Sequence, residues 1–294
     1  MTILTPEQSQ DYTFIRSLAE QATHLQINSI QLLRGQSSYN YLLNQHLIFK
    51  LPQRKENLPS YRTIAKNAPV IQKYLSVRIP QPQIHSLFIN GEPCQALTYE
   101  QIPGHTVPIL EFCRFPQRQR EYYFDQLAHI IHDLHSVPAS QLPAPPPVAL
   151  QVGLQKLFKR HAYLSTALQT TLQHCMGSRG DALIHKDLHS DNVCIGKNNQ
   201  IVGIIDLEGI VRGQPFLSFH PTLYAPKDLQ YLTRRYMSNY PKELSRLRLS
   251  IFQRSYNTMF YLLYLAQLMR PSTRVASIGV QEHHALARAF KSYD

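Results

Sequence analysis

Three polar residues in the second half of the chain have the types and spacing of a phosphoryl-transfer site. Asp187 and Asn192 lie five positions apart in the stretch HKDLHSDN, and Asp206 follows 14 positions later at the end of the apolar stretch IVGIID. Phosphoryl transfer requires an acceptor for the proton of the attacking hydroxyl and oxygen ligands for magnesium. A carboxylate and an amide oxygen on a tight loop, with a second carboxylate after the next hairpin, supply these groups. The alternative is a polar turn whose acids only cap backbone amides.

The surrounding sequence adds a family resemblance. HKDLHSDN resembles the catalytic loop of the protein-kinase-like fold, in the HxDLHxxN form typical of aminoglycoside phosphotransferases and choline kinases, and IIDLEG resembles the metal-binding strand end of that family. The resemblance implies that Asp187 orients or deprotonates a substrate hydroxyl, and that Asn192 and Asp206 bind Mg2+. It also implies a structural role for His185 and leaves the role of His189 open.

The same resemblance assigns further residues. Glu208 is either a second metal ligand, as in some relatives, or has no such role. The segment GQSSYN resembles the family loop whose small residues and backbone N–H groups approach nucleotide phosphates. Lys50 stands where relatives have the lysine that contacts the α and β phosphates, and the segment 99–102 stands at the hinge, where backbone groups would contact the adenine edge. The implied cofactors are ATP or GTP and Mg2+, and the implied nucleotide contacts are Gly35, Ser37, Ser38, Asn40, Lys50, Tyr99 and Gln101.

Two departures from the family pattern bear on activity. Relatives carry a glutamate on the first-lobe helix that pairs with the strand lysine, but in the segment 51–91 the sole acid is Glu56, which precedes the expected helix. We therefore expect Lys50 to have no acid within ion-pair distance, unless Glu56 reaches back to it. In GQPFLSF, Gln214 and Ser218 replace acids that order the catalytic loop in relatives, and charge-assisted hydrogen bonds are the stronger ones. A catalytically weak or inactive nucleotide-binding relative is thus the alternative to an active kinase.

The elements that position these residues are expected to form two lobes. Short apolar runs separated by Gly, Asn and Ser predict hairpins from Ile30 to Pro52 and from Ser86 to Leu97. Helical spacing predicts helices on either side of the first hairpin and through most of the later chain, with VCIG and IVGIID as two strands among them. The expected helices span 5–25, 60–76, 122–135, 154–172, 226–240, 241–269 and 281–291.

This pattern predicts an α+β, two-lobed protein-kinase-like fold. We expect residues 1–100 to form a strand-rich nucleotide-clamping lobe and residues 101–294 to form a mainly helical catalytic and substrate lobe. The hydrophobic content of 43% and charged content of 17% describe a globular protein, not a disordered one. No apolar run reaches the roughly 18 residues of a membrane span, and the start of the chain has no secretory pattern. We expect a cytoplasmic protein with no membrane partner.

Charge narrows the class of substrate. The net charge of +11 favours anionic partners, and from residue 209 onward twelve Lys and Arg stand against four acids. We therefore expect the γ-phosphoryl group to pass to a hydroxyl of a metabolite or antibiotic-like compound that is neutral or anionic. Nucleic-acid binding has only the net charge in its favour. A protein kinase is disfavoured because the chain has no Asp-Phe-Gly or Ala-Pro-Glu. The acceptor and the oligomeric state stay open.

Overall fold

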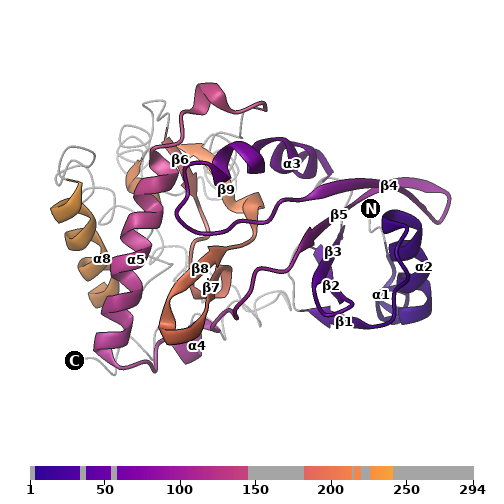
Figure 1. Ribbon diagram of the computed structural model, residues 1–294, viewed down its shortest axis with the longest axis horizontal. Helices are drawn as coiled ribbons and strands as arrows, with labels where there is room; N and C mark the ends of the chain where they lie inside the picture. Colours follow the sequence, from indigo (N-terminus) through magenta and orange to yellow (C-terminus); the bar gives the residue numbers. More distant parts are fainter. Residues whose placement is uncertain are drawn as a thin grey trace, which may run out of the picture.

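A five-stranded antiparallel sheet forms the N-terminal part of the protein (Figure 1). The computed structural model describes residues 4–33, 38–53, 58–144, 182–213, 215–219 and 226–240. The strand order is β1-β2-β3-β5-β4. The strands are β1 (Ile30–Leu33), β2 (Ser38–Leu43), β3 (Leu47–Pro52), β4 (Gln83–Ile89) and β5 (Glu92–Glu100). Both predicted hairpins are confirmed.

Two tight turns determine the register of these hairpins. Asn44 and Gln45 between β2 and β3 have φ of 47° and 61°, and Asn90 and Gly91 between β4 and β5 have φ of 55° and 78°. Two successive residues with positive φ suit the right-handed twist of the flanking strands, and Asn and Gly adopt this conformation at low cost. The turns put Asn40 opposite Lys50 on one face of the sheet.

Helices α1 (Pro6–Gln10) and α2 (Tyr12–Thr23) cover the other face of the sheet. The prediction of one continuous helix from Thr5 to Leu25 is wrong, because Asp11 between the two helices is extended, with φ −80° and ψ 95°. Its carboxylate accepts hydrogen bonds from the backbone N–H groups of Thr13 and Phe14, which caps α2. Thr5 and Gln8 form a capping box on α1. Asp favours such a cap over a helix interior.

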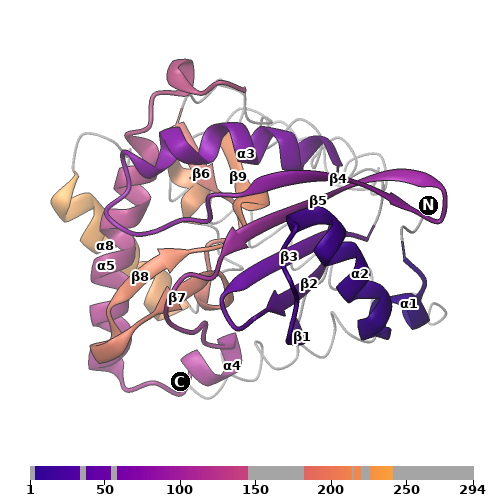
Figure 2. The same cartoon turned by 45° about the vertical axis from the view of Figure 1, so that its right-hand side comes forward.

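Helix α3 (Leu58–Gln72) belongs by its packing to the C-terminal part of the chain. The predicted helix is confirmed, although it begins two residues earlier and ends four residues earlier, and Pro69 lies within its last turn. Its apolar side chains Ile64, Ala68 and Ile71 join the apolar cluster built by residues after 100. Asn67 exchanges two hydrogen bonds with the backbone of Ala144, at 2.7 and 3.0 Å. Figures 1 and 2 show α3 beside β6 and β9.

The C-terminal part surrounds two small antiparallel sheets with helices. Helix α5 (Gln117–His135), which begins five residues before its predicted start, packs against α8 (Pro226–Asn239), and α4 (Ile109–Phe112) precedes them. The sheets pair β6 (Ala182–His185) with β9 (Ile210–Gly213) and β7 (Val193–Ile195) with β8 (Ile201–Ile204). Strands β7 and β8 were predicted, whereas β6 and β9 were not. The helices predicted over 154–172, 241–269 and 281–291 lie outside the described residues.

Backbone hydrogen bonds join the N-terminal sheet to the C-terminal part. Arg78, between α3 and β4, donates to Val202 O and accepts from Ile204 N, each at 3.0 Å. After β5, His105 exchanges hydrogen bonds of 3.0 and 2.8 Å with Ile195. Gly104 has φ 120°, and a Cβ there would lie 2.7 Å from Ile195 O, so only glycine fits. The two-lobed α+β architecture is thus confirmed, while the division at residue 100 stays a prediction. No helix in the described part is both long and apolar enough to cross a membrane.

Candidate active site

The loop predicted to be catalytic begins where β6 ends, at the buried His185. Its Nδ1 accepts a hydrogen bond from the backbone N–H of Asp187 at 3.2 Å, which places the ring proton on Nε2, and Nε2 donates to Ile205 O at 3.1 Å. Burial lowers the pKa of His185, so the ring is neutral. A Cβ at Gly209 would lie 2.5 Å from the imidazole, so this glycine makes room for the ring. His185 thereby links the loop to the segment that carries Asp206.

Asp187 lies half-buried with hydrogen-bond donors on both carboxylate oxygens. Asn192 Nδ2 donates to Oδ2 at 3.2 Å and to the backbone carbonyl of Asp187 at 2.8 Å. His189 Nε2 lies 3.3 Å from Oδ1. Since His189 Nδ1 accepts the N–H of Asp191, its proton sits on Nε2 and points at Asp187. The hydrogen bond from His189 lowers the pKa of Asp187 despite partial burial, so this carboxyl is ionised at neutral pH.

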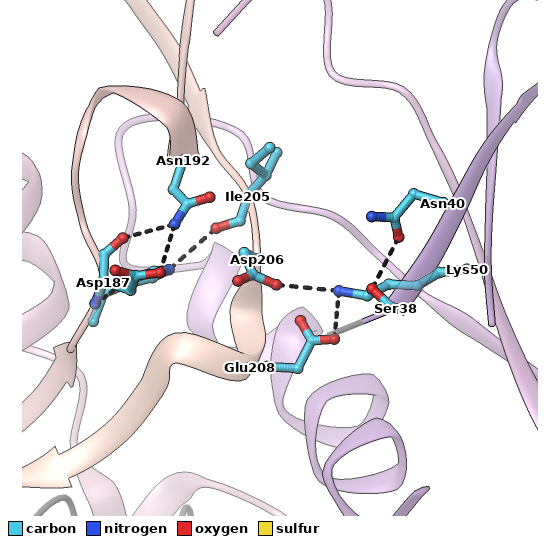
Figure 3. A network of polar contacts seen from close by, with 9 residues as sticks. Ser38, Asn40, Lys50, Asp187, Asn192, Ile205, Asp206 and Glu208 are labelled. Carbon is cyan, nitrogen blue, oxygen red and sulfur yellow. Dashed lines mark hydrogen bonds and ion pairs between the residues drawn. The ribbon is translucent and has the colours of Figure 1, made fainter. Parts of the chain in front are cut away.

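Asn192 occupies the short helix η3 (Ser190–Asn192) directly before β7. Both of its described side-chain hydrogen bonds use Nδ2, and Oδ1 faces away from Asp187 (Figure 3). Its backbone carbonyl accepts the N–H of Ile205 at 2.9 Å, which holds the two predicted metal-binding segments side by side. The amide oxygen of Asn192 is therefore available to a ligand.

Asp206 follows β8 in a left-handed conformation, with φ 59° and ψ 55°. This region is uncommon for residues other than glycine, although Asp and Asn tolerate it, and such conformations gather at functional sites. Its Oδ1 lies 3.1 Å from Lys50 Nζ. Burial opposes ionisation, but the Lys50 ammonium outweighs it and lowers the pKa of Asp206 to about 2. Asp206 is thus an anion at the end of the strand.

Lys50 projects from β3 toward this anion, and it is only 5% exposed. Its neighbours Phe49 and Leu51 pack under α1 and α2, so the alternation of side chains turns Lys50 to the opposite face. Its Nζ forms ion pairs with Asp206 and with Glu208 (Figure 3). Burial disfavours the ammonium charge, but the two carboxylates raise the pKa of Lys50 above its ordinary value.

The expectation that Lys50 has no acid within ion-pair distance is therefore wrong. It was based on the absence of an acid from α3, and the sequence of that helix has none. The acids come instead from the strand end and from the helical turn η5 (Leu207–Gly209), which the tertiary structure brings to β3. Glu56, the other predicted partner, lies outside the described residues.

Four of the other predicted nucleotide contacts lie in the described residues: Ser38 and Asn40 on β2, Tyr99 on β5, and Gln101 directly after β5. Ser38 Oγ donates to Asn40 Oδ1 at 3.2 Å, and Asn40 pairs with Lys50 across β2 and β3. Burial, which outweighs the effect of Lys50, raises the pKa of Tyr99 to about 12. The backbone N–H of Gln101 donates to His46 O at 2.7 Å, so this group is already bound within the protein. Gly35 and Ser37 lie outside the described residues, and nucleotide contact by this set stays a prediction.

Ser218, one of the two residues that replace acids of the family pattern, forms a hydrogen bond with a neutral side chain. Its hydroxyl lies 2.9 Å from His135 Nε2, and His135 Nδ1 lies 2.7 Å from the hydroxyl of Tyr236. The described contacts of Ser218 thus bind the end of η6 (Pro215–Ser218) to α5 and α8 through neutral groups, at a position where the family pattern has an acid. Gln214 lies outside the described residues.

The donor atoms suit magnesium better than a transition metal. Mg2+ takes oxygen ligands and is usually bound through one or two carboxylates, with water and phosphate oxygens completing its shell. Asp206 and Asn192 offer a carboxylate and an amide oxygen from adjoining segments. In the described ranges no group of three or more His, Cys, Asp or Glu side chains could hold a metal by itself. Glu208 is occupied by Lys50, so its predicted metal contact stays untested.

Tyr61 of α3 was not predicted as part of the site. Its side chain is 1% exposed, and its hydroxyl has no hydrogen-bond partner among the described residues. Burial raises the pKa of Tyr61, and the charges of Lys50 and Glu208 both act on it. A tyrosine at a helical position carries no signal in sequence that distinguishes it from an ordinary core residue.

Comparison with solved structures identifies proteins of the same fold. The GDP and kanamycin complex of APH(2")-IIia has a TM-score of 0.69 and 20% identity over 96% of this chain and 99% of that chain. The streptomycin-ATP-APH(2")-IIa ternary complex has a TM-score of 0.58 and 16% identity over 92% of both chains. Macrolide 2'-phosphotransferase MphH from Brachybacterium faecium has a TM-score of 0.61 and 15% identity over 98% of this chain and 99% of that chain. At these identities the likeness shows a shared kinase-like fold.

The sequence itself places the chain in a family. A comparison with curated proteins gives no match. Residues 29–225, about two thirds of the chain, match the model of the phosphotransferase enzyme family. The matched segment contains Lys50, Asp187, Asn192, Asp206 and Glu208. On this match, together with the fold, the chain belongs to the phosphotransferase enzyme family.

Proposed function

We propose that this protein transfers the γ-phosphoryl group of Mg-ATP or Mg-GTP to a hydroxyl of a small molecule. The observation that carries the proposal is the chain of contacts joining three segments: Asn192 donates to Asp187 within one loop, its backbone accepts from the residue before Asp206, and Asp206 pairs with Lys50. An anionic base, two oxygen donors for a metal and a buried cation are the parts that phosphoryl transfer needs.

Each residue has a role that follows from its surroundings. Asp187 is ionised and accepts the proton of the acceptor hydroxyl as the new oxygen–phosphorus bond forms and the bond to the departing nucleoside diphosphate breaks. His189 and Asn192 hold its carboxylate in place. Asp206 and Asn192 hold Mg2+, which neutralises phosphate charge when bound. Lys50 contacts the α and β phosphates, since a buried ammonium that already faces two anions can exchange one of them for a phosphate oxygen.

The acceptor class follows from charge. The net charge is +11, and the chain after residue 209 is rich in Lys and Arg, which repels polycationic compounds. We propose a neutral or anionic acceptor. A sugar or an already phosphorylated compound fits this description better than an aminoglycoside.

A panel of acceptors scored by nucleoside diphosphate release tests the proposal. The panel includes sugars, phosphorylated sugars, macrolides and aminoglycosides, each with ATP and with GTP. We expect turnover of a neutral or anionic member, and we expect Asp187→Asn to lower it by a factor of about a hundred to ten thousand because the base is lost. Nucleotide affinity of this isosteric variant should stay near that of the wild type. Undiminished turnover by Asp187→Asn removes Asp187 from the mechanism.

A weak or inactive nucleotide-binding relative is the second candidate. It is favoured by the absence of an acid from α3 and by the neutral Ser218–His135 contact. Calorimetric measurement of Mg-ATP and Mg-GTP binding, combined with the turnover of the acceptor panel, separates the two candidates. Nucleotide binding without turnover of any acceptor supports the second candidate, whereas turnover supports the first.

A further inference from the structure

The Lys50–Glu208 ion pair joins two parts of the protein that are built separately. Lys50 belongs to the sheet, whose apolar cluster includes its neighbours Phe49 and Leu51. Glu208 belongs to η5, and the adjacent Leu207 is part of the C-terminal apolar cluster. The ammonium of Lys50 is buried, and Glu208 Oε1 lies in direct contact with it (Figure 3). This pair therefore holds β3 against the segment that carries Asp206.

Helix α3 contains no acidic residue, but it contributes the phenol side chain of Tyr61. The helix packs against η5, and its sequence contains no Asp or Glu. Its Tyr61 is buried, within the electrostatic reach of Lys50 and Glu208, and its hydroxyl has no hydrogen-bond partner among the described residues. A buried hydroxyl without a partner is costly, so it marks a place where a partner is expected in another state of the protein.

We propose that Glu208 is a positioning residue that holds Lys50 for the nucleotide phosphates in place of a helix carboxylate, and that Tyr61 donates a hydrogen bond to Glu208 once nucleotide is bound. The inference rests on the proposed function, because it assumes that nucleotide binds at Lys50. In this arrangement Glu208 serves Lys50 and is not a metal ligand.

The exchange of partners follows from the donors and acceptors present. Lys50 now contacts both Asp206 and Glu208. With Asp206 holding a metal and phosphates beside Lys50, Glu208 would remain in contact with the ammonium. An ammonium has three donors, so it can contact phosphates and Glu208 together. Glu208 can then accept a hydrogen bond from the hydroxyl of Tyr61. That bond would satisfy the hydroxyl, which has no partner among the described residues.

Helix α3 is rigidly placed for this role. Asn67 is bound to the backbone of Ala144. Past the end of the helix, Ser76 donates two hydrogen bonds to Asp133 Oδ2, from its backbone N–H at 3.1 Å and from its hydroxyl at 2.6 Å. Tyr61 and Glu208 are thus parts of one framework. Lys50 enters that framework from the sheet, so the pair sets the position of β3 relative to the catalytic loop.

Nucleotide binding at varied Mg2+ concentration tests the role of Glu208. We expect Glu208→Gln to weaken binding of ATP by about tenfold at every Mg2+ concentration, with the Mg2+ dependence itself unchanged. The matched control Asp206→Asn should shift the Mg2+ dependence to higher concentration. If excess Mg2+ restores wild-type affinity to Glu208→Gln, then Glu208 is a metal ligand and the proposal is overturned. A double variant, Lys50→Met with Glu208→Gln, should bind no more weakly than Lys50→Met.

Tyr61→Phe tests the second half of the proposal, because it removes only the hydroxyl. We expect thermal stability without ligand to stay equal or rise, and ATP affinity to fall several-fold. Tyr123→Phe is the control: its ring packs with Phe112 and Phe124 in the C-terminal cluster, and its nucleotide affinity should match wild type. Wild-type affinity in Tyr61→Phe overturns the role of Tyr61.

The binding measurements separate this proposal from the proposed function. Wild-type protein that binds Mg-ATP but phosphorylates no acceptor contradicts the proposed function, and the variants still decide the roles of Glu208 and Tyr61. Wild-type protein that binds neither Mg-ATP nor Mg-GTP contradicts both.

Discussion

The orientation of the Asp187 carboxylate depends on neighbours within its own loop. His189 and Asn192 each donate to a different oxygen, and the backbone of Asp187 is in turn bound to His185. The carboxylate is therefore held by residues two to five positions away in sequence. This explains why the spacing HxDxHxxN is informative: each position holds or is held by Asp187.

Removing His189 should impair catalysis more than nucleotide binding. We expect His189→Ala to lower kcat by about tenfold to a hundredfold, because a small misplacement of a reacting group has effects of this size. KM for nucleotide should stay near the wild-type value. His189→Asn keeps a side-chain N–H donor and should recover part of the rate. Equal kcat in His189→Ala and wild type would show that Asp187 needs no support from this ring.

Metal dependence should follow Asp206 and, less strongly, Asn192. We expect Asp206→Asn to weaken Mg2+-dependent nucleotide binding strongly, because a carboxylate is replaced by a neutral ligand. Asn is the suitable replacement since it tolerates the left-handed backbone of Asp206, whereas alanine there would add backbone strain of roughly 1–2 kcal/mol. Asn192→Ala should have the smaller effect. Calorimetry with and without Mg2+ measures both, and an unchanged Mg2+ dependence in Asp206→Asn contradicts the metal assignment.

At the scale of elements, a hydrogen-bonded histidine joins α5, η6 and α8. His135 contacts the hydroxyls of Ser218 and Tyr236, and a neutral ring can donate to one of them and accept from the other. Burial, with His132 adding to it, lowers the pKa of His135 to about 3. The junction is consequently suited to neutral pH.

Acid should weaken this junction. In the unfolded chain a histidine has a pKa of about 6.5, so between that pH and about 3 the unfolded state binds a proton that the folded state does not. Stability therefore falls as the pH falls through this range, by at most about 1.4 kcal/mol per pH unit from this residue. Urea denaturation at several pH values should show a shallower decline for His135→Gln. The control is His24→Gln, at an exposed site, and equal slopes for wild type and His135→Gln contradict the assignment.

At the scale of the whole molecule, the lobes meet along a backbone seam at Gly203. A Cβ at this position would lie 2.8 Å from the backbone oxygen of Arg78 and 2.7 Å from Ile102 Cγ2. Three segments therefore approach each other more closely than a side chain allows: the α3–β4 connection, the segment after β5, and β8. Ile102 lies in the segment predicted to be the hinge, so we expect the seam to affect nucleotide binding as well as stability.

A side chain at Gly203 should push the three segments that meet there apart. We expect Gly203→Ala to destabilise the protein by about 1–3 kcal/mol, the usual cost of adding a methyl group where backbone cannot yield. Nucleotide affinity should fall with it, because the hinge moves. Gln200→Ala, at an exposed position of the same hairpin, is the control and should leave both quantities near wild type. Wild-type stability in Gly203→Ala would mean that the seam opens without cost.

The sequence by itself determined the features that depend on near neighbours. The turns at Asn44 and Asn90, the two-lobed α+β class, and the loop from His185 to Asn192 follow from local backbone preference and from hydrogen bonds over a few residues. Spacing along the chain is sufficient for such contacts. The break between α1 and α2 is also local, because Asp11 caps α2 with its own carboxylate, and the preference of Asp for a cap is a signal that the helix prediction passed over.

Only the tertiary structure decided which distant groups share the buried charge at Lys50. Glu208 is 158 positions away and reaches Lys50 from η5, which packs against α3 and β6. Tyr61 and the contact between His135 and Ser218 depend likewise on how helices dock, and docking follows from apolar side chains that are interchangeable in sequence. The absence of an acid from α3 led to the wrong prediction that Lys50 has no partner. Ion pairing depends on distance in space and not on position in a sequence pattern.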